Sequence, residues 1–323
     1  MASTARRRYG SVALLMAAIL LACIIITAFT RVTEREDGRL RLAAASYPVY
    51  IAALNVTDGV DGVQVVNLVP AQTGCLHDYQ LTPDNMITLS GADALILNGA
   101  GAESFLDSAR EQFPELAAID TSEGVSLLES RHVHDHDHGH GEEAGADEAE
   151  EDLAHYNEHI WTSPSRYRQQ VENLLDGLTA LDPGHAEQYA ANAEAYLSQI
   201  DAVRQELLDA AAALPTDACI TFHDSLAYFA EDIGLRPVAA LSIGEDSGVS
   251  ASDLRSAEQA AEQAGSVLLL YDNQYPTEYG YIADSAGWSA ALALDMAAGG
   301  EAEKGAWVDA MRLNAEILRA AAA

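Results

Sequence analysis

A long segment without glycine or proline, residues 186–214, constrains the fold of this chain more than any other feature. Its larger apolar side chains recur at steps of three, four or seven residues, which places them on one face of a helix. Such a helix would extend about 43 Å, enough to run the length of a small domain. Proline lies just outside both ends, at Pro183 and Pro215. We therefore expect one rigid helix that joins two lobes; the alternative is an ordinary long packing helix.

On both sides of this helix, short apolar runs alternate with amphipathic segments, a pattern typical of parallel sheets with helices on their faces. The sequence predicts an α/β protein with two small lobes, 40–184 and 215–323, each with a parallel four-stranded sheet flanked by helices, joined by the long helix at 185–214. The predicted strands are 40–45, 63–69, 92–97, 117–120, 218–222, 236–242, 266–270 and 290–294. The predicted helices are 49–54, 83–89, 103–113, 225–233, 251–264, 277–286 and 303–318.

The N-terminus has the pattern of a membrane anchor. Arg6, Arg7 and Arg8 precede an apolar stretch of about 18 residues, which is long enough to cross a bilayer and places the rest of the chain outside. An uncleaved signal anchor is favoured slightly over a lipoprotein lipidated at Cys23, because the apolar run continues past that cysteine. In both cases residues 1–31 form the anchor and 32–39 a tether, and the protein works on the outer face of the cytoplasmic membrane.

The formal net charge of −33 argues against nucleic-acid or anionic-lipid partners. A histidine- and acid-rich segment, residues 131–155, cannot contribute to a core. Imidazole binds zinc, copper and nickel better than magnesium or calcium. We expect an auxiliary loop that collects metal ions; the alternative is a disordered insert without a role. Its alternating histidines are His132, His134, His136, His138 and His140.

Four other residues combine into a candidate metal site. Three of them fall near the ends of predicted strands, where ligands bind in open parallel sheets, and each lobe contributes two. Three imidazoles and one carboxylate make a four-coordinate zinc set. Each residue taken singly is more often a core, loop or turn residue, so the prediction depends on the combination. The four residues are His77, His159, His223 and Asp295.

Several motifs occur in a specific order. They are Ala45-Ser-Tyr-Pro-Val-Tyr, His77-Asp-Tyr-Gln-Leu-Thr-Pro, Gly91-Ala-Asp-Ala-Leu-Ile-Leu-Asn-Gly, His159-Ile-Trp-Thr-Ser-Pro, Phe222-His-Asp-Ser-Leu-Ala-Tyr-Phe and Leu292-Ala-Leu-Asp. In that order they resemble the zinc- and manganese-binding solute-binding proteins of metal-importing ABC transporters, over roughly residues 40–320. The resemblance implies metal held in a cleft between two lobes, at the same four ligand positions. His223 favours zinc, because manganese-type members usually carry Glu there; manganese is the alternative.

The chain departs from the family pattern at two places. Cys75 and Leu76 stand where an acidic residue and Pro usually precede the first His, and Cys219 lies four residues before His223. A disulfide between Cys75 and Cys219 that braces the lobes is the first interpretation, with free thiols or metal ligation as alternatives. The second departure is Asp272-Asn273-Gln274, where the family often has Glu, and Asp272 is a reserve carboxylate ligand. Two neighbours of the histidines are predicted to orient the imidazoles, Glu158 and Asp224.

The resemblance implies an extracytoplasmic, high-affinity receptor that delivers Zn²⁺ to the permease and ATPase of an ABC importer. We expect a monomer with no nucleic-acid partner and no catalytic residues. A zinc hydrolase is the rival from another class, but the chain has no His-Glu-x-x-His helix and no Gly-x-Ser-x-Gly turn. An adhesin or storage protein is a further alternative, in which only the histidine-rich loop matters.

Overall fold

The computed structural model describes residues 38–71, 73, 76, 79–130, 156–241, 249–274, 282 and 287–323. Several predictions fall outside these residues: the anchor and most of the tether, the histidine-rich loop, His77 and Cys75, and nearly all of the helix predicted at 277–286. Within the described ranges, no helix is both long and apolar enough to cross a membrane.

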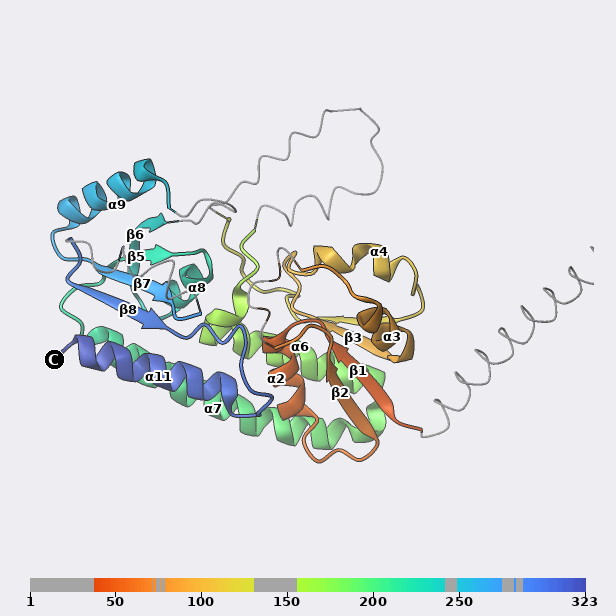
Figure 1. The fold of residues 1–323 in the computed structure, drawn as a ribbon. Helices are drawn as coiled ribbons and strands as arrows, with labels where there is room; N and C mark the ends of the chain where they lie inside the picture. Colours follow the sequence, from red (N-terminus) through yellow and green to blue (C-terminus); the bar gives the residue numbers. More distant parts are fainter. Residues whose placement is uncertain are drawn as a thin grey trace, which may run out of the picture.

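The first lobe is a parallel four-stranded sheet with strand order β2-β1-β3-β4 (Figure 1). Side chains alternate between its faces, as the pleat of a strand requires. Leu42 and Ile96 join the large core shared with the long helix, whereas Ala43 and Leu95 pack into a separate core on the opposite face. The elements are β1 Leu40–Ala44, α2 Tyr47–Val56, β2 Val63–Asn67, α3 Pro83–Gly91, β3 Ala94–Leu97, η2 Ser104–Leu106, α4 Asp107–Arg110 and β4 Ala117–Asp120.

The second lobe repeats the same arrangement, with a parallel sheet of order β6-β5-β7-β8. The elements are β5 Ala218–Phe222, α8 Ser225–Asp232, β6 Arg236–Leu241, α9 Ala251–Ala264, β7 Leu268–Asp272, β8 Ala290–Leu294 and α11 Ala306–Ala321. The predicted fold class, two α/β lobes with parallel four-stranded sheets, is confirmed.

The long helix is α7, Ala186–Ala212, and its predicted apolar face is buried from Tyr189 to Leu207. It contacts α2 of the first lobe and α11 of the second. Figure 1 shows α7 and α11 side by side along the bottom of the molecule. One continuous core runs from Leu42 through Ile200 to Leu294. Since apolar side chains of both lobes pack on the same helix, α7 joins them as predicted.

Among the described helices, two regions differ most from the prediction. No element is predicted over residues 164–181, yet they form α6, Pro164–Leu181. This stretch carries the usual signals of a helix. Ser163 caps it by accepting from Arg166 N at 3.2 Å, and Pro164 is its first residue. Its buried residues recur mostly at steps of three or four. The helix predicted at 103–113 shortens to η2 and α4, because the residue before Pro114 is disfavoured in helical conformation.

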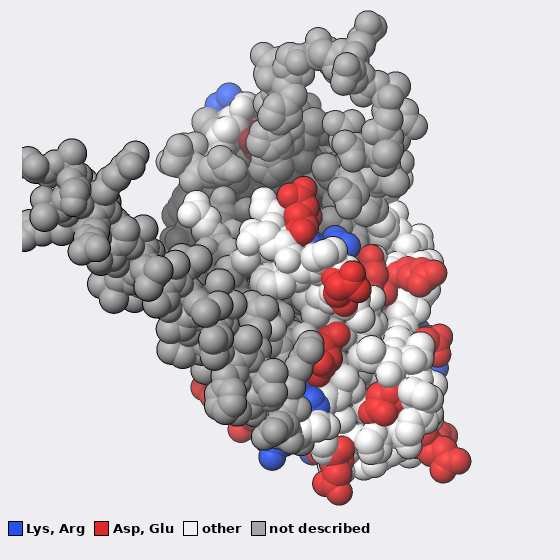
Figure 2. All heavy atoms as spheres, turned by 90° about the vertical axis from the view of Figure 1, so that its right-hand side faces the viewer, with Lys and Arg blue, Asp and Glu red and all other residues white. Residues whose placement is uncertain are grey.

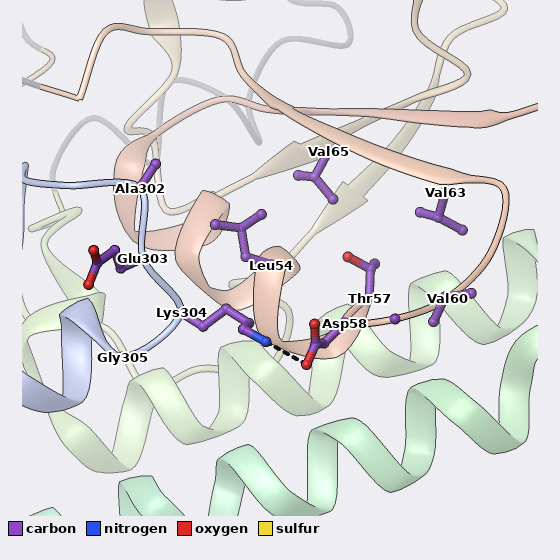
Figure 3. A pocket seen from close by; sticks show the side chains of 11 residues that line it. Leu54, Thr57, Asp58, Val60, Val63, Val65, Ala302, Glu303, Lys304 and Gly305 are labelled. Carbon is purple, nitrogen blue, oxygen red and sulfur yellow. Dashed lines mark hydrogen bonds and ion pairs between the residues drawn. The ribbon is translucent and has the colours of Figure 1, made fainter.

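The segment after β8 returns from the second lobe to the first before α11 begins. Tyr47 of α2 donates its hydroxyl to Glu301 O at 2.7 Å, and Asn55 Nδ2 donates to Lys304 O at 2.9 Å. The ammonium of Lys304 pairs with Asp58 at 2.5 Å (Figure 3). The lobes are therefore connected by this segment as well as by α7.

Candidate metal-binding site

Two of the predicted ligands, His159 and His223, meet between the lobes. Their ring centroids lie 5.1 Å apart in an edge-to-face arrangement of 86°. His159 is buried and precedes the short helix η3, Ile160–Thr162, which leads into α6. His223 directly follows β5, as predicted. Imidazoles from distant parts of the sequence are thus in contact.

The backbone at His223 is unusual. Its φ of 77° lies in the left-handed region, which is rare for residues other than glycine and common at functional sites. The peptide N–H of Ser225 donates to His223 Nδ1 at 3.1 Å. The neutral ring therefore carries its proton on Nε2 in this conformation. Binding a cation at Nε2 requires the ring to turn or to exchange that proton.

Two aspartates stand at neighbouring strand ends in the second sheet. Asp272 is the last residue of β7 and pairs in register with Leu294, directly before Asp295. Burial is the main cause that raises the pKa of Asp272 to about 6; the Gln274 N–H and the charges of both histidines lower it, and Asp295 raises it. Because His159, His223 and Asp295 all act on Asp272, the four side chains share one region of the molecule.

Asp295 is held firmly by its neighbours. Asn314 of α11 accepts from Asp295 N at 2.8 Å and donates to Asp295 O at 2.7 Å. The carboxylate oxygen Oδ1 of Asp295 accepts from Ala297 N at 2.8 Å. Trp161, from the turn after His159, donates its Nε1–H to Met296 O at 2.9 Å. The segment carrying Asp295 is thereby fixed against the segment carrying His159.

Among the described residues, an acceptor that the sequence does not predict lies closer to the His159 ring than the predicted one. Asn157 Oδ1 lies 2.9 Å from His159 Nδ1, whereas the predicted partner, Glu158, has its Oε1 at 3.5 Å. A lone Asn two residues before a His gives no signal by itself, because its role depends on the folded backbone around it. Asp224 Oδ2 accepts from Ser130 Oγ at 3.1 Å, and its role toward His223 stays a prediction.

The complete ligand set extends beyond the part of the chain that the structure describes. Within that part, no three His, Cys, Asp or Glu side chains are arranged to hold a metal ion together. His77 is outside it, so the convergence of all four predicted ligands stays a prediction. Cys219 is fully buried in β5, and its predicted disulfide also stays a prediction, since Cys75 is outside too.

Two cavities are lined by residues other than His159 and His223. One of about 640 Å³ is lined by Leu54, Val65 and the Asp58–Lys304 pair (Figure 3). Another of about 290 Å³ is lined by Phe113 and residues of α4. Neither is lined by His159, His223, Asp272 or Asp295. Figure 2 views the molecule from the right-hand side of Figure 1 and shows acidic side chains spread over the described part of this face, with few basic ones among them.

Comparison with known proteins places this fold in a family. A family model named ZnuA, described as zinc-uptake complex component A periplasmic, matches residues 43–321. The chain belongs to this family. The match begins within β1 and extends to the last residue of α11, so nearly all of both lobes falls within it. The resemblance expected from the ordered motifs is therefore confirmed.

The relatives in this family are distant in sequence. The iron-binding protein YfeA of Yersinia pestis is 28% identical over 178 residues, which cover 54% of this chain and 52% of that protein. The zinc-binding protein AdcA of Streptococcus pyogenes serotype M1 is 25% identical over 291 residues, covering 88% of this chain and 56% of the relative. A crystal structure of ZnuA has a TM-score of 0.68 at 25% identity, covering 88% of this chain and 100% of that one. This chain thus spans about half the length of the first curated relatives that it matches.

Proposed function

We propose that this chain is an extracytoplasmic receptor that binds Zn²⁺ between its lobes and delivers it to the permease of an ABC importer, which a cytoplasmic ATPase drives. The contact between His159 and His223, whose ring centroids lie 5.1 Å apart, is the main support for the proposal. Imidazole and carboxylate are ligands that zinc prefers, and Asp272 and Asp295 lie in the same region. Membership of the zinc-uptake family supports a binding protein rather than an enzyme.

The proposed ligands are His77, His159, His223 and Asp295, with Asp272 in reserve. His77 would come from the segment between β2 and α3, so that each lobe supplies two ligands. An ion held in this way would be released when a small displacement of one lobe, on docking to the permease, disturbs the ligand geometry. We propose that the receptor is a monomer tethered to the membrane by residues 1–31.

The histidine-rich loop is proposed to assist capture. The residues that flank it, Glu129 and Tyr156, form an antiparallel bridge, so they lie side by side. Ser130 donates to the carboxylate of Asp224, the residue after His223. The residues that flank the loop therefore adjoin the candidate site, which supports transfer of an ion from the loop to the ligands.

Zinc titration of residues 32–323, in competition with a chromophoric chelator, tests this function. We expect one tightly bound equivalent in the wild type and in a variant without residues 132–152. The double variant His159→Ala/His223→Ala should bind more than about 100-fold more weakly. His185→Ala is the control, because His185 pairs with Asp182 at 2.7 Å before α7. Unchanged binding in the double variant would overturn the proposal.

A manganese-specific receptor is the second candidate. YfeA is named for iron, so relatives in the comparison differ in their metal. Competitive titration of the two ions separates the candidates: preference for zinc at equal concentrations supports the zinc receptor, and preference for manganese supports the alternative.

A further inference from the structure

Asn157 is a buried side chain that contacts the segments of both interlobe histidines. Only 1% of the Asn157 surface is exposed to solvent. Asn157 Oδ1 accepts from the peptide N–H of His159 at 3.0 Å and lies 2.9 Å from His159 Nδ1. Asn157 Nδ2 donates to Asp224 O at 2.8 Å, and Asp224 directly follows His223. One amide therefore joins the two segments that bring the imidazoles together.

The orientation of this amide follows from its backbone partners. A peptide N–H can only donate, and a peptide oxygen can only accept. Oδ1 must therefore face His159, and Nδ2 must face Asp224 O. Since Oδ1 has no hydrogen to give, His159 Nδ1 must be the donor in their contact. The neutral ring of His159 then carries its proton on Nδ1 and its lone pair on Nε2, which is the form that ligates a metal through Nε2.

The main chain of Asn157 is fixed by both lobes as well. Its N–H donates to Leu128 O at 2.8 Å, and its carbonyl accepts from the Tyr228 hydroxyl at 2.6 Å. That hydroxyl in turn accepts from Leu128 N at 2.8 Å. Tyr228 is fully buried in α8, the helix that follows His223. The amide of Asn157 is thus held in place by a hydrogen-bonded frame that spans the interface.

We propose that Asn157 is a positioning residue of the metal site, which sets the tautomer of His159 and ties this imidazole to the peptide beside His223. The proposal rests on the proposed function as a zinc receptor. Substitutions distinguish the two hydrogen-bonding roles of the Asn157 amide, the acceptor for His159 and the donor to Asp224 O. Asn157→Asp keeps the acceptor for His159 but replaces the donor to Asp224 O by an oxygen. Asn157→Leu removes both.

Two measurements test the proposal. Long-range ¹⁵N–¹H NMR correlation of the imidazoles in the metal-free protein at pH 8 shows which ring nitrogen carries the proton. We expect His159 to be protonated at Nδ1 in the wild type and in Asn157→Asp, and to lose that preference in Asn157→Leu. Glu158→Gln should leave the tautomer unchanged, because Glu158 lies farther from the ring. Zinc titration should show about 10- to 100-fold weaker binding in both Asn157 variants.

Asn173→Asp is the matched control. Asn173 Nδ2 donates to Thr121 O at 2.8 Å and Glu123 O at 2.9 Å, within the first lobe, so the substitution removes an equivalent donor away from the histidines. Its zinc affinity should equal that of the wild type. Protonation of wild-type His159 at Nε2 would overturn the proposal, as would full zinc affinity in folded Asn157→Leu. If the wild type binds no zinc, the proposed function fails, and the tautomer measurement still decides the role of Asn157.

Discussion

Replacing Asp232 by Ala tests how the two lobes are held together. Asp232 ends α8, and its side chain is only 3% exposed. Oδ1 accepts from Arg204 of α7 at 2.9 and 3.0 Å, and Oδ2 accepts from Ser163 Oγ at 2.9 Å and Ser165 N at 2.6 Å at the start of α6. Burial alone would raise the pKa of Asp232, but these contacts hold it below its ordinary value. One carboxylate therefore joins the helix after His223 to the helix after His159.

The expected loss in the free energy of unfolding follows from the exposure of Asp232 and Arg204. Removing one member of a buried ion pair costs about 3–5 kcal/mol. The Arg204 side chain is 36% exposed, so water can solvate part of its charge after the substitution. We expect Asp232→Ala to lower the free energy of unfolding by about 2–3 kcal/mol. Asp217→Ala is the control: its pair with Arg236 is exposed and 3.6 Å long, and its loss should cost under about 0.5 kcal/mol.

Urea unfolding of the metal-free protein, followed by tryptophan fluorescence, measures both variants. The folded pKa of Asp232 lies below the unfolded one, so its stabilisation is full above pH 3.8 and disappears as the pH falls through the folded pKa. The difference between wild type and Asp232→Ala should therefore shrink in acid. A cost at pH 7 equal to that of Asp217→Ala would refute the reasoning.

Three further substitutions give direct tests. Gly177→Ala should destabilise the protein by about 1–3 kcal/mol in urea unfolding, because a Cβ there would lie 2.5 Å from the Ile119 side chain; a neutral effect would contradict this close packing of α6 on β4. Trp307→Ala should cost about 3–5 kcal/mol, since Trp307 is fully buried and stacks on Tyr167 at 4.3 Å; a loss under about 1 kcal/mol in the same assay would disagree. Burial raises the pKa of Glu103 from 4.5 to about 8, so wild-type stability should fall as the pH rises between these values, and Glu103→Gln should flatten that slope; an equal slope in both proteins would argue against it.

The fold could be predicted to a large extent because its elements are simple in sequence. Strand β4 and helix α9 begin and end where the apolar runs and the Ser250 cap indicate. The face of α7 follows from its spacing. Helix α6 was harder to predict, because exposed and half-buried polar residues outnumber its four buried apolar side chains from Tyr167 to Leu178. Element type depends on local pattern, whereas the order of strands within each sheet comes from packing that a pattern does not contain.

Of the candidate site, the sequence could predict the positions of residues whose type coincides with a strand end. His223 and Asp295 directly follow β5 and β8, and His223 contacts His159. Asn157 and Asp232 could not be recognised, because both act on backbone groups or on an arginine brought close by folding. In the sequence, a polar residue of this kind cannot be distinguished from a solvated one, because its partners are known only from the folded structure.

The connection from β8 back to the first lobe has a mechanical consequence. With α7 on one side and the Tyr47–Glu301 and Asp58–Lys304 contacts on another, the two lobes form a closed frame. A frame of this kind resists wide opening, so the release proposed above would need only a small displacement of one lobe, together with movements of single side chains and short turns. The left-handed backbone at His223 is one place in such a frame where a small rotation changes which ring nitrogen of the imidazole faces the other candidate ligands.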